Sequence, residues 1–304
     1  MLIRTFLTTL ALLFTGLVSA QFHNILTHPD PVAYTCVADD AMYEGARIIA
    51  STVATIGSPL SGSGPHVRVA RINSAGGVAW ERDYNFEAGL RAMHVIPIDV
   101  NSAVLVALRM PDPTNGVPAR TVLIRFNTNN GNPVAVNEIK EPTGPNGGEK
   151  GLVILHGIKS FGKLILTGWL GGQNGLVLPE ERVATVMSVD IPAPDDDIAA
   201  TINWIKGIDS PLSYLDFGDH DMGTHIVEVP NHGYFISGSA NFIYTTDQGA
   251  SEHHQSILSA LVDYDGTVAW AKTTALETTT SSDPRVDRHV VASSAAAISI
   301  ESAG

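Results

Sequence analysis

One hairpin pattern occurs four times along the chain, and it constrains the fold more than any other feature. In SILSALVDYDGTVAWAKTTA, residues 256–275, an alternating apolar run meets an Asp-Gly turn and leaves as a second alternating run. This pattern predicts an antiparallel hairpin. The four copies cover residues 67–84, 120–139, 182–208 and 257–274. Three of them carry a tryptophan in the second arm, namely Trp80, Trp204 and Trp270, while the second copy has Val136 near that place.

A second hairpin is expected before each of these copies. HIVEVPNHGYFISGS, residues 225–239, is the clearest case, and residues 94–108 and 156–168 follow the same pattern. Residues 47–51 are expected to form the second arm of the earliest copy, and residues 289–304 begin a fifth. Each unit therefore predicts four strands over roughly sixty residues, the length scale of a tandem structural repeat.

These repeats predict an all-β fold, a β-propeller of four-stranded antiparallel blades. A four-stranded sheet in tandem copies cannot bury both faces alone, so it stacks against its neighbours, as in a propeller. The repeated tryptophans are expected to be structural anchors between blades, each worth about 3–5 kcal/mol on truncation to Ala. About four and a half blades are visible, and we favour a truncated sequence over an unusual ring closure. The expected blades are residues 32–85, 90–140, 151–208, 222–274 and a partial copy at 286–304.

The repeats resemble the blades of secreted bacterial β-propeller proteins. HGYFISGSANFI followed by LVDYDGTVAWAKTT is similar to blades that read roughly G-G-Y-x-x-A-G-S, a loop, then L-D-x-x-G-x-x-x-W-x-K-T-Y. The resemblance is strongest in residues 225–274 and 67–84. It implies an architecture, and it carries no catalytic residue over to this chain.

The first twenty residues have the organisation of a secretory signal peptide. Arg4 precedes a largely apolar core, and Val18-Ser19-Ala20 matches a cleavage site with small residues. We therefore expect residues 21–304 to be exported, either secreted or held at the cell surface or in a periplasm. The alternative is an N-terminal anchor helix.

The net charge argues against some partners, and the cysteine content limits how the fold can be stabilised. The formal net charge is −13, which disfavours nucleic acids and anionic membrane surfaces because binding to them depends on Lys and Arg. No later apolar run is long enough for a membrane helix, so no membrane insertion is expected after signal cleavage. Cys36 is the only cysteine, which leaves packing rather than disulfides to stabilise the fold, and a small buried side chain is its simplest role.

The best site candidate is a histidine that recurs at one position of the repeat. His94, His225 and His289 each lie eight residues before the equivalent point of the following strand, and His156 joins them if its turn is one residue shorter. Alignment by residue count puts Val37 there in the first copy. This position starts the innermost strand of a blade. A ring of imidazoles there could bind a metal or act as general acid and base. The alternative is a packing or hydrogen-bonding residue repeated by duplication.

A second candidate is the polar segment DFGDHDMGTH at residues 216–225. Its metal-ligand candidates are Asp219, His220, Asp221 and His225, since imidazole and carboxylate groups suit zinc or manganese. The spacing matches no metalloenzyme signature, and a polar loop between blades is the simpler explanation. No nucleophile elbow, phosphate loop or dinucleotide fingerprint occurs. We therefore expect no cofactor, and a divalent metal ion is the one alternative that stays open.

These features favour an exported, non-catalytic propeller that acts as a binding, adhesion or scaffold module for an extracellular glycan or protein ligand. The alternative is an extracellular polysaccharide lyase or glycoside hydrolase. It would use His94, His156, His225 and His289 around the channel, with or without a metal. Convergence of these side chains would favour the enzyme.

Overall fold

Sixteen strands form four antiparallel sheets in the computed structural model. It describes residues 32–39, 45–53, 65–84, 89–110, 119–140, 151–171, 183–194, 199–208, 221–245 and 251–281. No helix occurs among these residues, and none of them forms a helix that could span a membrane. The predicted all-β class and its four-stranded antiparallel sheets are confirmed.

Each sheet consists of four strands in sequence order. Sheet 1 contains β1 (Val32–Asp39), β2 (Arg47–Val53), β3 (His66–Ile72) and β4 (Val78–Tyr84). Sheet 2 contains β5 (Leu90–Asp99), β6 (Ser102–Arg109), β7 (Arg120–Asn127) and β8 (Pro133–Glu138). Sheet 3 contains β9 (Leu152–Ser160), β10 (Lys163–Leu170), β11 (Val183–Asp190) and β12 (Ile202–Ile208). Sheet 4 contains β13 (Met222–Val229), β14 (Gly233–Thr245), β15 (Ser251–Val262) and β16 (Val268–Ser281).

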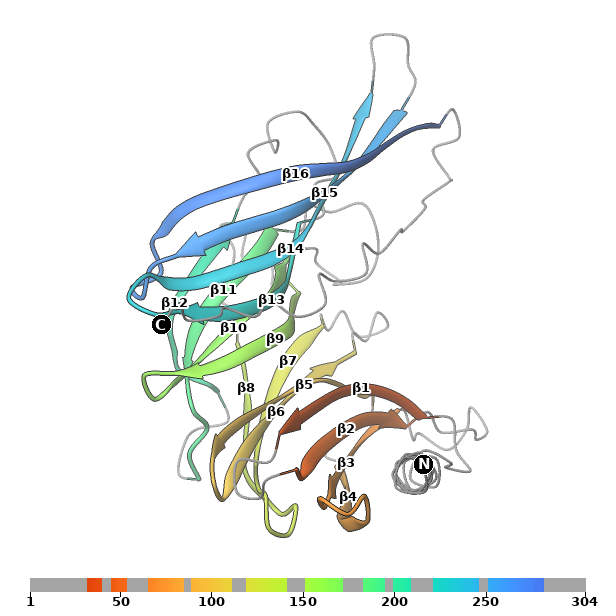
Figure 1. Ribbon diagram of the computed structural model, residues 1–304, viewed down its shortest axis with the longest axis vertical. Coiled ribbons are helices and arrows are strands. Elements are labelled where there is room, and N and C mark those ends of the chain that lie inside the picture. The colour runs from red at the N-terminus through yellow and green to blue at the C-terminus, as the bar shows by residue number, and fades with distance from the viewer. Residues whose placement is uncertain are drawn as a thin grey trace, which may run out of the picture.

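The sheets follow one another along a curved path, with sheet 1 at one end and sheet 4 at the other (Figure 1). The first strands are neighbours: β5 lies against β1 and β9, and β9 lies against β13. The four described sheets do not close into a ring. The expected propeller is therefore seen only as a series of stacked sheets.

The hydrophobic core lies between the sheets. One cluster joins sheets 1 and 2, a second joins sheets 2 and 3, and a third joins sheets 3 and 4. Middle strands are buried on both faces, as in β6, whose residues from Ser102 to Leu108 are all buried. Outer strands such as β4 are mostly exposed. Burial of apolar faces between consecutive sheets thus explains why the alternating pattern has to recur.

At two of the three junctions between the described sheets, a tryptophan of one sheet packs on a turn of the next. The Trp80 indole of β4 lies on Gly131, in the β7–β8 turn of sheet 2, and its Nε1 donates to the Thr128 carbonyl at 2.8 Å. Trp204 of β12 lies in the same way on Gly266, in the β15–β16 turn of sheet 4. A Cβ at either glycine would lie 2.7–2.8 Å from indole carbons. We call this contact, a tryptophan of one sheet on a turn glycine of the next, the Trp–Gly clasp.

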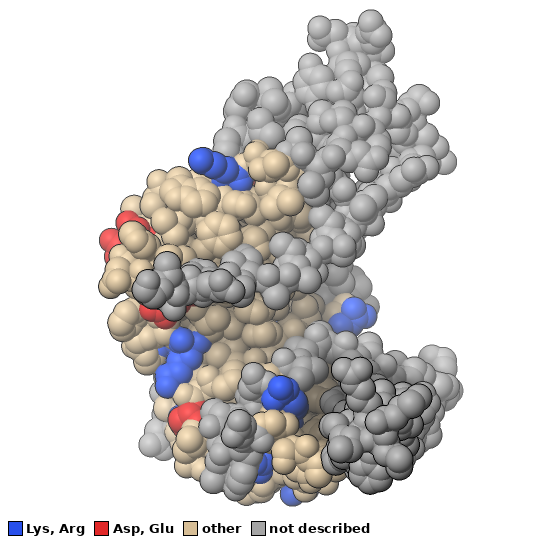
Figure 2. Space-filling view, viewed as in Figure 1, with Lys and Arg blue, Asp and Glu red and all other residues tan. Residues whose placement is uncertain are grey.

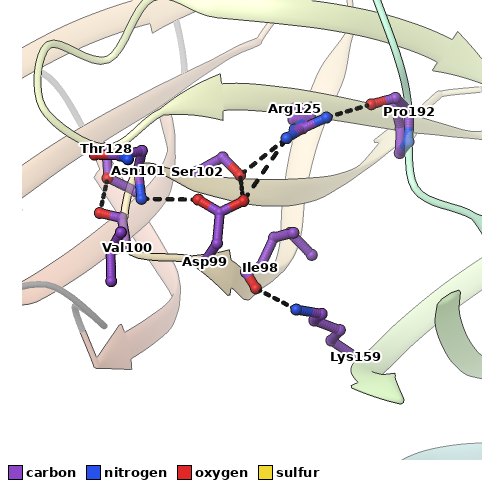
Figure 3. Close-up of polar contacts among 9 residues, drawn as sticks. All are labelled: Ile98, Asp99, Val100, Asn101, Ser102, Arg125, Thr128, Lys159 and Pro192. Carbon is purple, nitrogen blue, oxygen red and sulfur yellow. Dashed lines mark hydrogen bonds and ion pairs between the residues drawn. The ribbon is translucent and has the colours of Figure 1, made fainter. Parts of the chain in front are cut away.

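The junction of sheets 2 and 3 has polar contacts instead. The register places Ala135, rather than the expected Val136, where the other sheets carry tryptophan. Arg125 of β7, which pairs with Ala135, donates to the Pro192 carbonyl at 3.3 Å, and Lys159 donates to the Ile98 carbonyl at 2.6 Å (Figure 3). A pocket of about 280 Å³ remains here, lined by residues 133–137 with Ala193 and Pro194. It fits the absence of a large side chain at position 135.

Candidate functional site

Three of the four aligned histidines come together. His94, His156 and His225 belong to β5, β9 and β13, the first strands of three successive sheets. The ring centroids of His94 and His156 are 4.1 Å apart, with planes tilted by 32°. Those of His156 and His225 are 5.0 Å apart, with a tilt of 39°. We call these three residues the histidine cluster.

A β-bulge precedes each histidine of the cluster. The register shifts between Ala92 and His94 in β5, and between Gly223 and His225 in β13. In β9 the extra residue is Leu155, which directly precedes His156. A bulge re-aims the next side chain and is frequent beside functional sites. The same local irregularity therefore presents each imidazole.

The same register corrects the alignment of the first copy. In β1 the shift lies between Tyr34 and Cys36, so Cys36 holds the position that histidine holds in the other sheets. The prediction from residue count, which puts Val37 there, is wrong. The error arises because an alignment by residue number does not see where a bulge inserts its extra residue. No sequence signal marks this position, because the extra residue of a bulge is defined by the pairing of the strands.

Glycines allow the backbones to approach closely at this site. A Cβ on Gly168 of β10 would lie 1.9 Å from the Val153 carbonyl oxygen, and one on Gly238 of β14 would lie 1.8 Å from that of Met222. Gly157, directly after His156, would meet Leu166 and Ile96 side chains at 2.5 and 2.7 Å. Glycine is the residue that permits such contacts at a bulge. The approach of β9 to sheet 2 therefore depends on Gly157.

Hydrogen bonds link each histidine to its surroundings. His94 Nε2 donates to the Gly157 carbonyl at 3.1 Å, and His156 Nδ1 accepts from the Ile226 amide at 3.4 Å. The Thr224 hydroxyl donates to the Ser237 carbonyl at 3.2 Å, so it accepts from His225 Nδ1, 3.2 Å away. Neutral His94 is thus protonated at Nε2 and neutral His225 at Nδ1. One nitrogen of each ring keeps a lone pair.

The cluster is held neutral. Burial lowers the pKa of His94 to about 4, with the charge of His225 adding to this and the Gly157 hydrogen bond opposing it. Burial, together with the charges of His94 and His225, lowers the pKa of His156 to about 3. Burial also lowers the pKa of His225. All three side chains are half-buried, and at neutral pH they offer lone pairs rather than charge.

The other candidates are placed as follows. Asp219, His220 and His289 lie outside the described residues. Asp221 is buried and directly precedes β13. Within the described ranges, no group of three or more His, Cys, Asp or Glu side chains is arranged to hold a metal ion as it stands. The rings of the cluster are stacked, and their nitrogens do not yet converge on one point.

The described surface carries no continuous basic area on the face seen in Figure 2, where Lys and Arg lie at separate places. The net charge of −13 predicts that nucleic acids are not partners. That expectation remains a prediction.

No family model matches the sequence, and no curated protein matches it. Among solved structures the chain is similar to a chimera of ACO and RPE65, with a TM-score of 0.39 and 9% identity, over 84% of this chain and 64% of that one. It is also similar to cobalt-substituted Synechocystis ACO, with a TM-score of 0.39 and 10% identity, over 86% of this chain and 67% of that one. A tryptophan mutant of Synechocystis apocarotenoid oxygenase gives 0.38 and 8%, over the same shares. The chain thus spans about two thirds of these structures, and similarity at this level supports no statement about its activity.

Proposed function

We propose that the chain is an exported protein of β-propeller type whose histidine cluster binds one divalent transition-metal ion, zinc first among them. The observation that carries this is the contact of the His156 ring with the rings of His94 and His225, which come from two other sheets. Residues so far apart in the chain meet only because the first strands of successive sheets lie side by side. The propeller assignment draws support from the same stacking, since radial stacking of four-stranded sheets brings first strands to a common axis.

The two ring separations fit a shared ion if the side chains rotate out of their stacked arrangement. Three imidazoles on one tetrahedral zinc, each with a bond of about 2.0–2.1 Å, have ring centroids roughly 5 Å apart. The observed separations are 4.1 and 5.0 Å. Rotation about the side-chain torsions would turn the stacked rings edge-on toward one point.

The hydrogen bonds support a ligand role for two of the three rings. Histidines that bind metals usually donate their other ring N–H to a carbonyl or similar acceptor, which fixes the tautomer. His94 does so to Gly157 and His225 to Thr224, leaving Nδ1 and Nε2 respectively for a metal. His156 accepts a long hydrogen bond of 3.4 Å from Ile226, which it would give up if it adopted the tautomer that binds through Nε2.

The pKa values favour metal binding over direct proton transfer. A general acid or base works best with a pKa near the working pH, and those of His94 and His156 lie at about 4 and 3. A metal needs the neutral ring, which here meets little competition from protons. The lyase or hydrolase alternative is therefore best supported in its metal-dependent form.

An ion held by three protein ligands keeps a position open for water or substrate, which suits hydrolysis or elimination on an extracellular glycan. Cys36 stands at the fourth equivalent register position, in β1, and a thiolate is also a zinc ligand. If it binds, the site would be closed and structural rather than catalytic.

Titration calorimetry with zinc on the purified, chelator-treated chain tests the proposal, with elemental analysis of the product. We expect one equivalent of zinc to bind, and His156→Gln or His225→Ala to weaken binding at least tenfold. His232→Ala is the matched control, because His232 is exposed and lies outside the cluster. Zinc binding that is equal in all variants, or absent, would refute the metal site. The cluster would then be a hydrogen-bonded packing element, and the binding, adhesion or scaffold account would stand in its place.

A further inference from the structure

The two ends of the row of four described sheets carry the two halves of one Trp–Gly clasp. Trp80 and Trp204 each cover a glycine of the following sheet, whereas Trp270, on the outer strand of sheet 4, is 38% exposed. The glycines under the first two, Gly131 and Gly266, are buried, while Gly76 in the corresponding turn of sheet 1 is half-exposed.

The register shows that Trp270 holds the clasp position. Each tryptophan pairs with the third-strand residue at a register shift whose extra residue lies in the fourth strand: Trp80 with Arg71, Trp204 with Ser188 and Trp270 with Leu261. Trp270 is therefore presented on the face that turns away from sheet 3, where the next sheet would stand. Its neighbours in its own sheet are Phe235, at a ring distance of 6.0 Å, and Lys272, whose Nζ lies 5.6 Å from the ring centroid.

The turn of sheet 1 has the form of an acceptor turn. Asn73 N donates to Gly77 O at 2.8 Å and Gly76 N to Asn73 O at 2.9 Å. In the covered turn of sheet 4, Asp263 N donates to Thr267 O at 2.8 Å and Gly266 N to Asp263 O at 2.9 Å. The φ angles of Gly76 and Gly266 are 84° and 88°. The free turn thus reproduces the backbone of the turn that Trp204 covers.

A basic residue lies two positions after the tryptophan of each clasp. Arg82 follows Trp80 and donates to the Asn130 carbonyl, directly before Gly131, at 3.2 Å. Lys206 follows Trp204 in the same spacing. The hydrogen bonds from Thr267 lower the pKa of Asp265, which directly precedes Gly266, and the charge of Lys206 adds to this lowering.

At the free end, Lys272 follows Trp270 in the same spacing. At the free turn, Ala75 directly precedes Gly76, so its carbonyl corresponds to that of Asn130. The two free halves therefore match in the cation and its acceptor as well as in the indole and the glycine.

We propose that Trp270 and Lys272 of one molecule dock on the Asn73–Gly77 turn of a second copy of this chain, end to end. The occupant is argued from continuity with the two clasps inside the molecule: among the described residues, Trp270 covers no turn glycine, and the half-exposed Asn73–Gly77 turn has the form of the turn that Trp204 covers. The contact is heterologous, joining different surfaces of the two copies, so it builds either a closed ring or an open row. This inference does not depend on metal binding.

Sedimentation velocity of the full chain over a wide range of concentration tests the contact. We expect association of the native chain, and a weakening of roughly 30-fold or more in Trp270→Ala, since buried aromatic anchors dominate interfaces. Gly76→Asn attacks the other half: asparagine tolerates a positive φ, so the turn can persist while the new side chain fills the place of the indole. Val100→Ala is the control, because Val100 is 51% exposed and lies in the β5–β6 turn, outside both halves of the clasp.

A mixture of the two variants makes the test specific. Trp270→Ala keeps an intact turn and Gly76→Asn keeps an intact tryptophan, so we expect the mixture to form dimers and nothing larger. Circular dichroism establishes that each variant is folded. A native chain that stays monomeric at every concentration, as it would if Trp270 closed a ring within one molecule, would overturn the proposal. Association that both variants retain would also overturn it.

Discussion

His94 and His156 lie on the first strands of different sheets, yet their imidazole centroids are only 4.1 Å apart. The contact joins residues that no local sequence pattern brings together. It depends on the bulge before each histidine and on Gly157, which lets β9 approach sheet 2. Burial disfavours the charged form of both rings, so both imidazoles are neutral in the folded protein.

Protein stability should fall as the pH is lowered from about 6.5 toward 4. In the unfolded chain a histidine takes up its proton near pH 6.5, whereas folded His94 and His156 do so only at about 4 and 3. The unfolded state therefore binds more protons in this window, and the free energy of unfolding decreases as the pH falls. Urea unfolding at several pH values measures this. His156→Gln should flatten the dependence, and the exposed His232→Gln should leave it unchanged; an equal slope in both variants would contradict the account.

Removing the Trp80 side chain from the junction of sheets 1 and 2 should destabilise the fold strongly. Trp80→Ala is expected to cost about 3 kcal/mol, because it leaves a cavity over Gly131 and unpairs the Thr128 carbonyl. Trp80→Phe keeps an aromatic ring but loses the indole N–H, and it should lower the free energy of unfolding by only about 1 kcal/mol. Urea midpoints measured at low protein concentration give both values. Trp270→Ala is the comparison within the chain, and an equally large loss there would contradict the junction model.

The two turn glycines Gly131 and Gly162 provide a matched pair. Both have a positive φ, 70° and 74°, so alanine at either should cost about 1 kcal/mol from the backbone alone. At Gly131 the new Cβ would also lie 2.7 Å from Trp80, whereas at Gly162 no atom lies within 4 Å. Gly131→Ala should therefore be the more damaging by at least about 1 kcal/mol. Thermal unfolding of both variants measures the difference, and equal losses would show that the indole does not press on the turn.

Arg125 should contribute more to the free energy of unfolding than a surface arginine, because it links sheets 2 and 3 where the other junctions have a Trp–Gly clasp. Its guanidinium contacts Ser102 Oγ and the Pro192 carbonyl, both at 3.3 Å. Arg125→Ala should lower the free energy of unfolding by about 1–2 kcal/mol, in the range for hydrogen bonds to charged groups. Arg91→Ala, an exposed arginine of β5, is the control. Urea unfolding of both variants measures the effect, and equal, small losses would assign this junction to apolar packing alone.

The sequence predicted the hairpins well because their determinants are local. Alternation and turn glycines placed the Trp80 and Trp270 hairpins, and both are present. The spacing of eight residues aligned His94 with His225, and the structure brings each within ring contact of His156.

What the sequence could not supply was register. One extra residue at a bulge moves Cys36, not Val37, to the histidine position, and puts Ala135, not Val136, at the tryptophan position. Bulges depend on pairing between strands, which residue counting does not reveal. The tautomers and lowered pKa values of the cluster also follow only from its three-dimensional surroundings.

Zinc K-edge X-ray absorption on the zinc-loaded chain tests the central claim most directly. The account predicts a first shell containing three imidazole nitrogens at about 2.0–2.1 Å, with the outer-shell scattering of histidine rings, and the loss of one ring in His225→Ala. A sulfur at about 2.3 Å would add Cys36 to the ligands. A first shell of oxygen alone, unchanged in His225→Ala, would place the metal elsewhere and contradict the account.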